Sequence, residues 1–339
     1  MGRILLFNPS HEMALASDAA QYTPPKHVRQ MESDLCLLPL LWANDDDCIL
    51  TPNGLVDVQG NDVSDITDMI PTPWGWNRSV RNRFLRMGVN PSLMPSEQQL
   101  NVWRSYASRA WAADYCNCLY ERSKEDGLVA NHVSFLRSRS DYEAWVSRYQ
   151  SVPFIVKSEY SSSGRGNRVF YDQPSSFDFQ FVVIDTFYDK LLDFALEFEI
   201  AKQEVRYLGL SVFRTTTEGR YNFNYLCSQQ QLREMIVCNL SDATVLDRLI
   251  ETHRQLLSER LLGHYEGIAG IDMMVVRGGL IHPCVEINLR MNMGVLAMKL
   301  YDKGLSSLPR SPYGGQSFYP VIEDVKFYIV YTPTPKSAQ

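Results

Sequence analysis

The alternation of apolar and polar residues predicts short strands near the start of the chain. Residues 4–7, 48–50 and 55–58 are apolar runs of strand length. The Thr51-Pro52-Asn53-Gly54 segment separates the last two runs and carries the residues of a turn. A first buried strand followed by a hairpin is therefore expected in this region.

Prolines and a helical pattern define the end of the same region. Pro71 and Pro73 are interpreted as loop residues, because proline removes a backbone hydrogen-bond donor. Ser96 and Glu97 carry the start signals of a helix, and the helical pattern continues to about Leu119. We therefore expect a small α/β domain followed by a long helix.

The segment from residue 153 to residue 171 predicts two strands joined by a loop of small residues. The loop, residues 158–166, has the sequence Ser-Glu-Tyr-Ser-Ser-Ser-Gly-Arg-Gly. Rossmann and Walker phosphate motifs require a strand followed by a helix, and the third glycine of the Rossmann pattern is replaced here by Val169. No glycine in the chain precedes a lysine. Both motifs are excluded, whereas a phosphate-covering flap between two strands is not.

The second half of the chain predicts antiparallel strands and a long helix. Strand patterns occupy residues 181–184, 194–200, 207–213, 271–276 and 280–287, and a hairpin partner is expected after residues 217–220. Ser241 is expected to cap a helix whose apolar face continues to Leu261. A last strand pattern, residues 325–331, lies in a proline-rich tail that we expect to fray after Thr332.

The hairpin between residues 271 and 287 brings two carboxylates together. With Gly278-Gly279 as a two-residue turn, Arg277 pairs with Leu280, and Asp272 faces Cys284 or Val285. A one-residue bulge would place the two acids directly opposite each other. In both cases the carboxylates lie at the same end of neighbouring strands, about 5–7 Å apart.

The residues after Glu286 extend this acidic cluster. Asn288 shares a face with Glu286 because strand side chains alternate, and Arg290 keeps the same phase. Two carboxylates and an amide oxygen suit Mg²⁺, especially when phosphates complete its coordination. Arg290 could balance negative charge on a phosphoryl or acyl oxygen. The alternatives are polar residues at a solvated strand end and a salt bridge from Arg290 to one of these two carboxylates.

Lys157 and the loop after it form a second candidate site. Lys157 ends a strand, and the small residues 161–166 would let backbone N–H groups approach phosphate oxygens closely. A lysine beside such a loop can reach a phosphate as a point charge. The alternative is an ordinary serine-glycine turn between two strands.

The order of these features resembles the ATP-grasp superfamily. Residues 156–169 are similar to the glycine-rich loop of its biotin-carboxylase-like members, and Glu286-Ile287-Asn288-Leu289-Arg290 resembles their Glu-x-Asn-x-Arg signature. The resemblance covers about residues 106–300 and, more loosely, the N-terminal region.

The resemblance implies an α/β (α+β) fold. A Rossmann-like pre-ATP-grasp domain, residues 1–105, would precede a two-lobed ATP-grasp domain with antiparallel sheets, residues 106–304. Within the latter, the lid lobe would span about residues 125–185 and the metal-binding lobe about residues 190–304. Residues 305–339 would form a C-terminal extension.

The resemblance also implies roles for individual residues. ATP would be bound by Arg109, Lys157, Ser161, Ser162, Ser163, Gly164, Arg165, Gly166, Asp185, Thr186, Phe187 and Asp193. Two of these positions depart from the family pattern, with arginine in place of a phosphate-binding lysine at Arg109 and aspartate in place of the hinge glutamate at Asp185. One or two magnesium ions would be held by Asp272, Glu286 and Asn288. Arg290 would stabilise the acylphosphate or the tetrahedral intermediate.

The implied activity is that of an ATP- and Mg²⁺-dependent carboxylate–amine ligase. A substrate carboxylate would attack the γ-phosphate to give an acylphosphate, and an amine would then displace phosphate. Mn²⁺ is a candidate substitute for Mg²⁺. Two alternatives remain: a catalytically silent nucleotide-binding regulatory protein, and an ATP-grasp kinase that phosphorylates a hydroxyl group.

The amino-acid composition limits the classes of binding partner. The 339 residues carry a net charge of −6, which argues against nucleic-acid binding, and no window approaches the roughly 20 apolar residues of a membrane span. The seven cysteines are scattered, which favours reduced thiols and a cytoplasmic location. We therefore expect small-molecule carboxylate and amine substrates. The sequence leaves the oligomeric state open, with a homodimer as a common state of this class.

Two histidines were considered for substrate contact. His11 follows the first strand, where sheet ligands often bind, but a solvated histidine in a helix-capping loop is the alternative. His282 precedes Pro283 and is interpreted as a structural residue.

Overall fold

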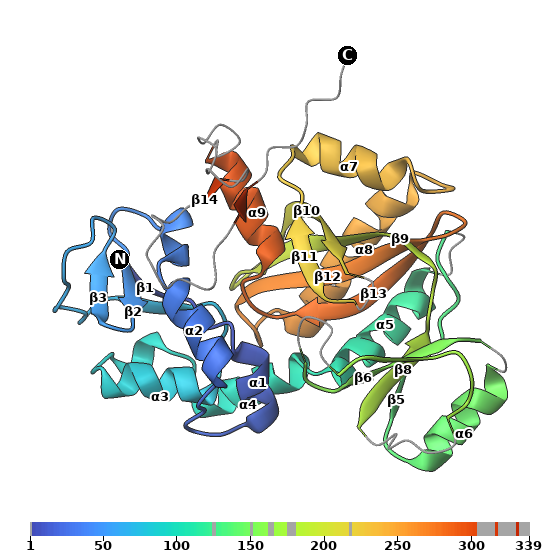
Figure 1. Cartoon of the computed structure of the whole chain (residues 1–339), viewed down its shortest axis with the longest axis horizontal. Helices are drawn as coiled ribbons and strands as arrows, with labels where there is room; N and C mark the ends of the chain where they lie inside the picture. The colour runs from blue at the N-terminus through green and yellow to red at the C-terminus, as the bar shows by residue number, and fades with distance from the viewer. Residues whose placement is uncertain are drawn as a thin grey trace. The chain divides into compact units, whose positions relative to one another are not determined.

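The computed structural model describes residues 2–123, 127–149, 152–161, 166–174, 181–216, 219–303, 316–317 and 330–331. The chain forms two compact units. The first contains Met1–Asn101, Tyr225–Ser228 and Arg290–Gln339, and the second contains Val102–Asn224 and Gln229–Leu289. Most of the helices and strands are labelled in Figure 1.

The first unit is built on a four-stranded sheet with the order β3-β2-β1-β4. Its strands are β1 (Arg3–Leu6), β2 (Cys48–Thr51), β3 (Gly54–Asp57) and β4 (Ile70–Pro73). Strand β1 runs parallel to both β2 and β4, whereas β3 pairs antiparallel with β2. Three neighbouring parallel strands, β2, β1 and β4, give this sheet the Rossmann-like character expected from the sequence.

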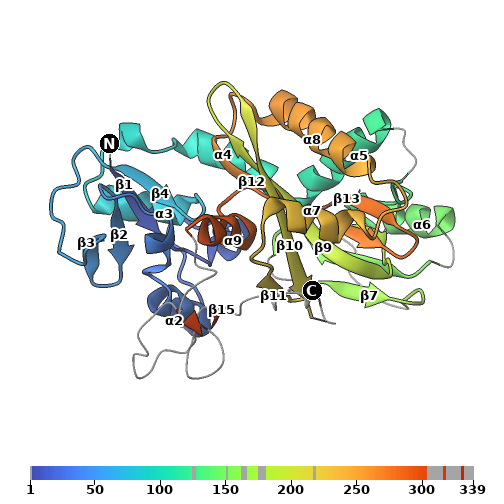
Figure 2. The same ribbon diagram turned by 90° about the horizontal axis from the view of Figure 1, so that it is seen from above.

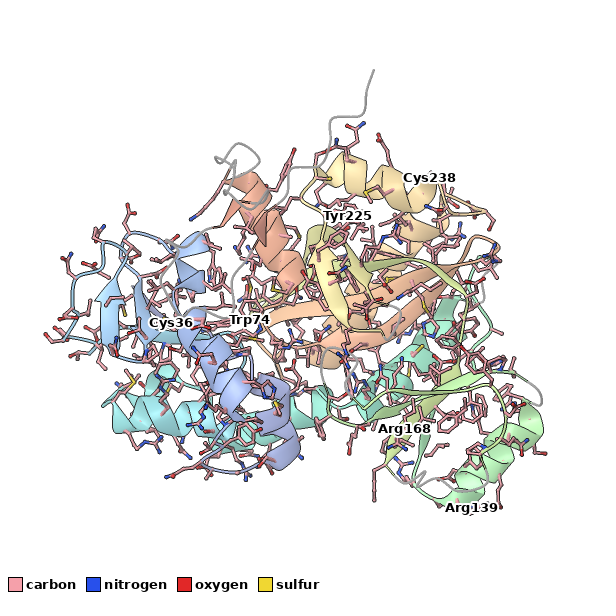
Figure 3. All side chains as sticks on the ribbon, viewed as in Figure 1. Cys36, Trp74, Arg139, Arg168, Tyr225 and Cys238 are labelled. Atoms are coloured by element: carbon pink, nitrogen blue, oxygen red, sulfur yellow. The ribbon has the colours of Figure 1, made fainter. Side chains whose placement is uncertain are left out.

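Helices and apolar side chains complete the first unit. The helices are α1 (His11–Ser17), α2 (Lys26–Asp34), α3 (Arg78–Arg86), α9 (Met293–Asp302) and the short 3₁₀ turns η1 (Leu38–Leu41) and η2 (Pro91–Leu93). One apolar cluster joins Phe7 and Trp74 to Leu296 and Leu300 of α9. The Trp74 ring, labelled in Figure 3, meets the Phe7 ring edge-on at 5.2 Å between centroids.

Strand β4 corrects the prediction that Pro71 and Pro73 lie in loops. Pro71 pairs with Ile4 and Pro73 with Leu6 in the parallel ladder. Strand β4 is the last strand of the sheet, and an edge strand tolerates proline because one side of its backbone needs no ladder partner.

The second unit contains a five-stranded sheet with the order β11-β10-β9-β12-β13. Its strands are β9 (Lys190–Ile200), β10 (Val205–Thr215), β11 (Tyr221–Asn224), β12 (Gly267–Val276) and β13 (Leu280–Asn288), and every neighbouring pair is antiparallel. Helices α7 (Gln229–Val237) and α8 (Val245–Leu261) pack on β10, and α5 (Arg109–Ser123) packs on β13 and α8. Figure 2 shows α5 and α8 side by side.

A smaller antiparallel sheet carries the serine-glycine segment. Its order is β5-β8-β6-β7, with β5 (Ser134–Leu136), β6 (Phe154–Ser158), β7 (Arg168–Phe170) and β8 (Val182–Thr186). Helix α6 (Arg139–Arg148) begins with a capping box between Ser138 and Asp141, and its Trp145 packs against Phe154 in the core of this part. The two antiparallel sheets agree with the predicted fold class.

Two helix predictions require correction. The stretch that begins at Glu97 is two helices, α4 (Glu97–Tyr106) and α5, because Ser108 interrupts it and accepts a hydrogen bond from the backbone of Trp111 with its Oγ. Ser241 does not cap α8, which begins at Val245. The Ser241 hydroxyl donates to the carbonyl of Gly279 instead.

The remaining predictions concern the tail and the membrane. Of the strand expected at residues 325–331, only β15 (Val330–Tyr331) belongs to the described residues, where it pairs with β14 (Gln316–Ser317), and the expected fraying after Thr332 lies outside them. In the described part of the chain, no helix has the length and apolar character required to cross a bilayer.

Candidate functional site

Arg109 joins the two motifs that the sequence singled out. It is the first residue of α5, and its side chain is only 5% exposed. Its guanidinium donates to the carbonyl of Ser158 at 2.7 Å, to the carbonyl of Ser161 at 3.1 Å and to the carboxylate of Glu286 at 2.8 Å. Its Nε is buried and has no hydrogen-bond partner among the described residues. The start of the small-residue loop and the predicted metal-binding strand therefore share one arginine.

The described part of the loop contains Ser161 and Gly166. Gly166 has φ of 79°, and a Cβ at this position would lie 2.9 Å from the Ser158 Oγ. Glycine is therefore required here both by the left-handed backbone and by the close approach of Ser158. The predicted ATP contacts at Ser162, Ser163, Gly164 and Arg165 lie outside the described residues.

Lys157 lies on β6 with its side chain buried. Its ammonium donates to the carbonyl of Val285 at 3.3 Å. Burial lowers the pKa of Lys157 and the Arg109 charge adds to this effect, whereas the charges of Asp185 and Glu286 oppose it. Lys157 thus occupies a poorly solvated position beside mixed charges.

A small cavity surrounds these groups. Its wall is formed by α5, β6, β8 and β13 together with the segment before β5. The lining residues are Arg109, Ala112, Ala113, Val133, Lys157, Val183, Asp185, Cys284 and Val285. Three predicted ATP-binding residues, Arg109, Lys157 and Asp185, are therefore brought to one cavity.

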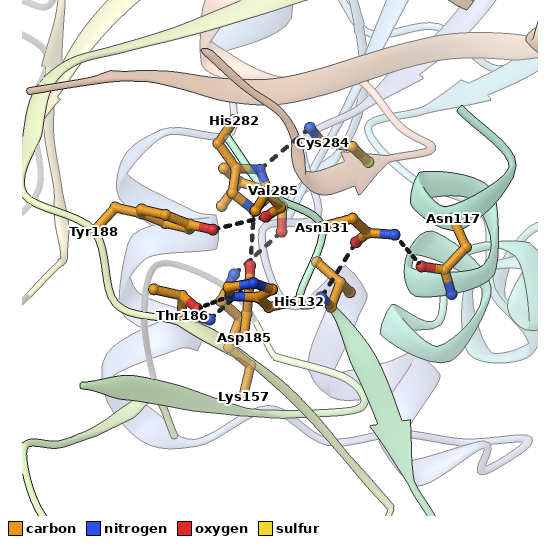
Figure 4. Close-up of polar contacts among 12 residues, drawn as sticks. Asn117, Asn131, His132, Lys157, Asp185, Thr186, Tyr188, His282, Cys284 and Val285 are labelled. Atoms are coloured by element: carbon orange, nitrogen blue, oxygen red, sulfur yellow. Dashed lines mark hydrogen bonds and ion pairs between the residues drawn. The ribbon is translucent and has the colours of Figure 1, made fainter. Parts of the chain in front are cut away.

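Both carboxylate oxygens of Asp185 form hydrogen bonds within the protein. Its Oδ2 lies 2.7 Å from the Nε2 of His282, and its Oδ1 accepts the backbone N–H of Thr186 at 2.7 Å. Figure 4 shows Lys157, Asp185 and His282 pointing toward one another from β6, β8 and β13. The side chains of Asp185 and His282 are 4% and 1% exposed, so this contact is shielded from water.

The other predicted hinge residues also make contacts within the protein. The hydroxyl of Thr186 shares a hydrogen bond of 2.6 Å with the Nδ1 of His132. The backbone N–H of Phe187 donates to the carbonyl of Pro153 at 2.8 Å. Phe187 is partly exposed, with 37% of its surface accessible.

Asp193 does not line the cavity around Lys157. Its Oδ2 forms an ion pair of 2.6 Å with Lys190 and accepts the hydroxyl of Thr215 at 3.0 Å. The contacts of Asp193 lie within β9 and β10, so its role toward a ribose stays a prediction.

The predicted metal-binding residues meet on β12 and β13. Asp272 lies directly opposite Glu286 in the ladder, and the Nδ2 of Asn288 donates to the Oδ2 of Asp272 at 3.2 Å. Within the described residues, no group of three or more His, Cys, Asp or Glu side chains could hold a metal. The present set has two carboxylates and one amide, a partial oxygen shell that fits Mg²⁺ when other oxygens complete it.

The register of this hairpin corrects the predicted turn. Val276, not Arg277, pairs with Leu280, so the loop has three residues, and an irregularity between Asp272 and Met274 restores the opposition of the two acids. The extra residues on β13 include Pro283, which cannot donate to a ladder. A bulge at this point re-aims the neighbouring side chains.

Helix α8 fixes this bulge. The Nε2 of His253 lies 3.0 Å from the carbonyl of Pro283, and its Nδ1 lies 2.9 Å from the hydroxyl of Tyr115. Burial lowers the pKa of His253 to about 3, so the ring is neutral and donates to the carbonyl through one nitrogen while the other accepts. The bulge is thereby held by a buried relay from α5 through α8.

Arg290 belongs to the first unit, where it forms an ion pair with Glu12 of α1. Its Nη1 also donates to the carbonyl of Met291 at 3.1 Å. Burial acts to raise the pKa of Glu12, but the charges of Arg290 and His11 lower it overall. The alternative for Arg290 was a salt bridge to one of the carboxylates of the acidic cluster, whereas the ion pair in the structure is with Glu12.

His11 is buried and not solvated. A Cβ on Gly75 would lie 2.5 Å from the His11 ring, so the imidazole packs directly on the glycine backbone. The side chain of Asn8 fixes this loop through hydrogen bonds to both backbone groups of Gly75. Burial lowers the pKa of His11 to about 4. The solvated-loop alternative is therefore wrong.

Three groups contact predicted site residues without having been indicated by the sequence: the His282 side chain, the Val285 carbonyl and the Glu12 carboxylate. His282 had a usable signal, because the period of two that aligns Glu286 with Asn288 also includes His282 and Cys284. The position of the Val285 carbonyl depends on the bulge, and the Glu12 contact joins residues 278 apart, so neither left a local pattern.

Comparisons with known proteins place the fold. No family model matches the chain, and no curated protein matches it. Among solved structures, biotin carboxylase from Campylobacter jejuni is similar over 93% of this chain and 74% of its own, with 13% identity and a TM-score of 0.50. Weaker similarity is found to N5-carboxyaminoimidazole synthetase from Staphylococcus aureus (11% identity, 91% and 78% covered, TM-score 0.47) and D-alanyl-alanine synthetase A from Vibrio cholerae (13%, 90% and 92%, TM-score 0.44). The similarity to biotin carboxylase concerns the fold alone.

Proposed function

Because the chain has the ATP-grasp fold, we propose that it is an ATP- and Mg²⁺-dependent ligase that activates a substrate carboxylate as an acylphosphate for attack by an amine. The biotin carboxylase with this fold was solved as a β,γ-ATP complex. The proposal for this chain depends on the contacts of its own residues.

The observation that carries the proposal is the double contact of Arg109. One guanidinium binds both Ser161, at the start of the loop, and Glu286, in the acidic hairpin. A phosphate flap and a metal cluster must reach the same triphosphate, and two stretches held by one side chain meet this requirement. The buried Nε–H of Arg109, which has no partner among the described residues, is a donor that a phosphate oxygen would satisfy.

Lys157 and the loop would hold the triphosphate. The Lys157 ammonium lines the same cavity as Arg109, and backbone N–H groups of residues 161–166 would cover the β- and γ-phosphates. Asp185, Thr186, Phe187 and Asp193 remain candidates for contacts with the nucleoside. Positioning and charge neutralisation account for most of the catalysis of phosphoryl transfer.

Asp272, Glu286 and Asn288 would hold Mg²⁺. The Asn288 Nδ2 is used on Asp272, so its Oδ1 is the atom that a cation would take. The bound ion would neutralise charge on the β- and γ-phosphates, and Mn²⁺ is a candidate substitute.

Arg290 would act on the acyl group. In the proposed reaction a carboxylate oxygen bonds to the γ-phosphorus as ADP leaves, and an amine then bonds to the acyl carbon as phosphate leaves. Negative charge develops on the acyl oxygen in the second step, and a guanidinium held in a fixed orientation can stabilise it. The half-buried ion pair with Glu12 supplies such an orientation.

A screen of substrates tests the function. The purified protein would be incubated with Mg²⁺, ATP and pairs of small carboxylates and amines, including amino acids, and ADP release would be measured. We expect one pair to stimulate release and to yield an amide detectable by mass spectrometry. Phosphorylation of a hydroxyl would replace the ligase by a kinase, and ATP binding without turnover would favour a regulatory protein.

A further inference from the structure

We propose that His282, acting through Asp185, is a positioning residue for Lys157, so that the ammonium of Lys157 is held where it would meet an ATP phosphate. The inference rests on the proposed function for its nucleotide. It assigns a role to a histidine that the sequence analysis treated as structural.

The first step is the proton on His282. The backbone N–H of Cys284 donates to the Nδ1 of His282 at 3.4 Å. An acceptor nitrogen carries no proton, so the ring proton that faces Asp185 is on Nε2. This Nε2 lies 2.7 Å from the Oδ2 of Asp185. His282 therefore donates to the carboxylate and fixes its orientation, while the N–H of Thr186 fixes the other oxygen.

The second step is the position of Asp185 relative to Lys157. In the antiparallel pair of β6 and β8, Lys157 lies opposite Val183, and Asp185 is two residues further on the same face. Diagonal neighbours of this kind lie within reach of a long side chain. Lys157, Val183 and Asp185 line the same cavity. The carboxylate that His282 orients therefore lies on the same face of the sheet as Lys157 and lines the same cavity.

The third step is the balance of charge around Lys157. Burial is the largest effect on the Lys157 amine and lowers its pKa. The charges of Asp185 from β8 and Glu286 from β13 favour the protonated amine, whereas the charge of Arg109 from α5 disfavours it. Glu286 already forms an ion pair with Arg109, so Asp185 is the carboxylate that can stabilise the charge of the Lys157 ammonium. A buried ammonium without a fixed anionic neighbour would lose its proton or withdraw from the cavity.

The fourth step is the origin of this arrangement in the sequence. The bulge at Pro283 brings His282 within hydrogen-bond distance of Asp185. It also brings the carbonyl of Val285 within hydrogen-bond distance of the Lys157 ammonium. The His253 relay holds the Pro283 carbonyl. One irregular segment of β13 thus supplies one hydrogen bond to Asp185 and accepts another from Lys157.

Substitutions at His282 test the proposal. Gln places an amide N–H near the position of the histidine Nε2, whereas Leu keeps the volume and removes the donor. We expect His282→Leu to weaken Mg²⁺-ATP binding about tenfold in calorimetry and His282→Gln to retain the wild-type affinity within about threefold. In a Lys157→Ala background, His282→Leu should change the affinity less than twofold. Equal weakening by His282→Leu in both backgrounds, or no weakening by it in the wild type, would overturn the proposal.

Two further measurements separate the outcomes. Leu256→Ala on α8, a fully buried position, controls for loss of stability. Compared with His282→Leu at a similar melting temperature, it should leave the affinity for Mg²⁺-ATP unchanged. Acetylation of Lys157 by acetic anhydride at pH 8, quantified by mass spectrometry against exposed Lys26, needs no nucleotide. Asp185→Asn and His282→Leu should raise the labelling of Lys157, and His282→Gln should not. Absence of ATP binding by the wild type refutes the proposed function, whereas unchanged labelling refutes the positioning role.

Discussion

The guanidinium of Arg109 lies 2.8 Å from the carboxylate of Glu286, although 177 positions separate them in the sequence. The same guanidinium contacts Ser158 and Ser161, so a helix N-terminus, the end of β6 and the acidic hairpin meet at one side chain. The first prediction follows from these contacts of Arg109.

Arg109→Lys should weaken Mg²⁺-ATP binding at least tenfold, a loss of about 1.4 kcal/mol. Lysine keeps the charge but cannot reach serine carbonyls and a carboxylate together, since only arginine has the fork of donors. Isothermal titration calorimetry measures the change. Arg122→Lys is the matched control, because Arg122 lies on the same helix and pairs with Glu259 at the surface. An equal effect of both substitutions would remove Arg109 from the site.

Glu286→Gln should abolish Mg²⁺-dependent ADP release and leave the fold intact. The amide oxygen can still accept from Arg109, so the structural contact survives while the negative charge for the cation is lost. Far-UV circular dichroism checks the fold, and a coupled ADP assay checks the activity. Glu266→Gln, on the segment before β12, serves as the control. Normal ADP release by the Glu286 variant would show that the metal assignment is wrong.

Gly166→Ala should impair nucleotide binding more than a matched glycine substitution. Gly166 and Gly219 have φ of 79° and 76°, so alanine at either position adds backbone strain of about 1–2 kcal/mol. Only at Gly166 would the new methyl meet a neighbour, the Ser158 Oγ at 2.9 Å, whereas nothing lies within 4 Å at Gly219. Urea unfolding should show similar losses of stability, and calorimetry should show reduced ATP affinity for the Gly166 variant alone. Equal ATP affinity in both variants would exclude this part of the loop from the site.

Acidification should destabilise the fold through His253. Its pKa in the folded protein is about 3, against an ordinary value of 6.5, so the unfolded chain binds more protons between these values and stability is lost as the pH falls through this range. At pH 5 the loss from this residue is about 2 kcal/mol. His253→Gln should flatten the fall in urea-unfolding free energy between pH 7 and pH 5, and His27→Gln, at an exposed position, should not. Parallel curves for wild type and the His253 variant would contradict the neutral buried histidine.

Arg290→Lys should slow amide formation by more than a hundredfold once a substrate pair is known, and change ATP affinity less than twofold. The reason is that Arg290 is assigned to the acyl transfer step and not to the nucleotide. Glu12→Gln should reproduce part of the defect, because Glu12 orients the guanidinium in the ion pair. Single-turnover product formation measures both. A large loss of ATP affinity in either variant would place Arg290 elsewhere in the reaction.

The regular parts of the fold were accessible from the sequence because they follow local rules. The period of two between Phe194 and Ile200 and the helical face up to Leu261 depend only on which residues face the core. Strand β4 was missed because its prolines are tolerated at a sheet edge, and the edge position of a strand is a property of the whole sheet.

The candidate site shows the same division between local and long-range information. Lys157, Glu286 and Asn288 were found from short motifs with fixed spacing. His282 was passed over because its partner, Asp185, is 97 positions away. The turn was misplaced because Gly278-Gly279 is typical of a two-residue turn, whereas the loop has three residues and the register shifts again between Asp272 and Met274. Contacts of this kind require the folded chain.

The most direct test of the central claim is equilibrium binding of a non-hydrolysable ATP analogue to the wild-type chain with and without Mg²⁺. The account predicts one nucleotide per chain, bound at least tenfold more tightly with Mg²⁺ than with EDTA, and loss of that enhancement in Glu286→Gln. The absence of measurable binding, or binding that Mg²⁺ does not strengthen, would contradict it.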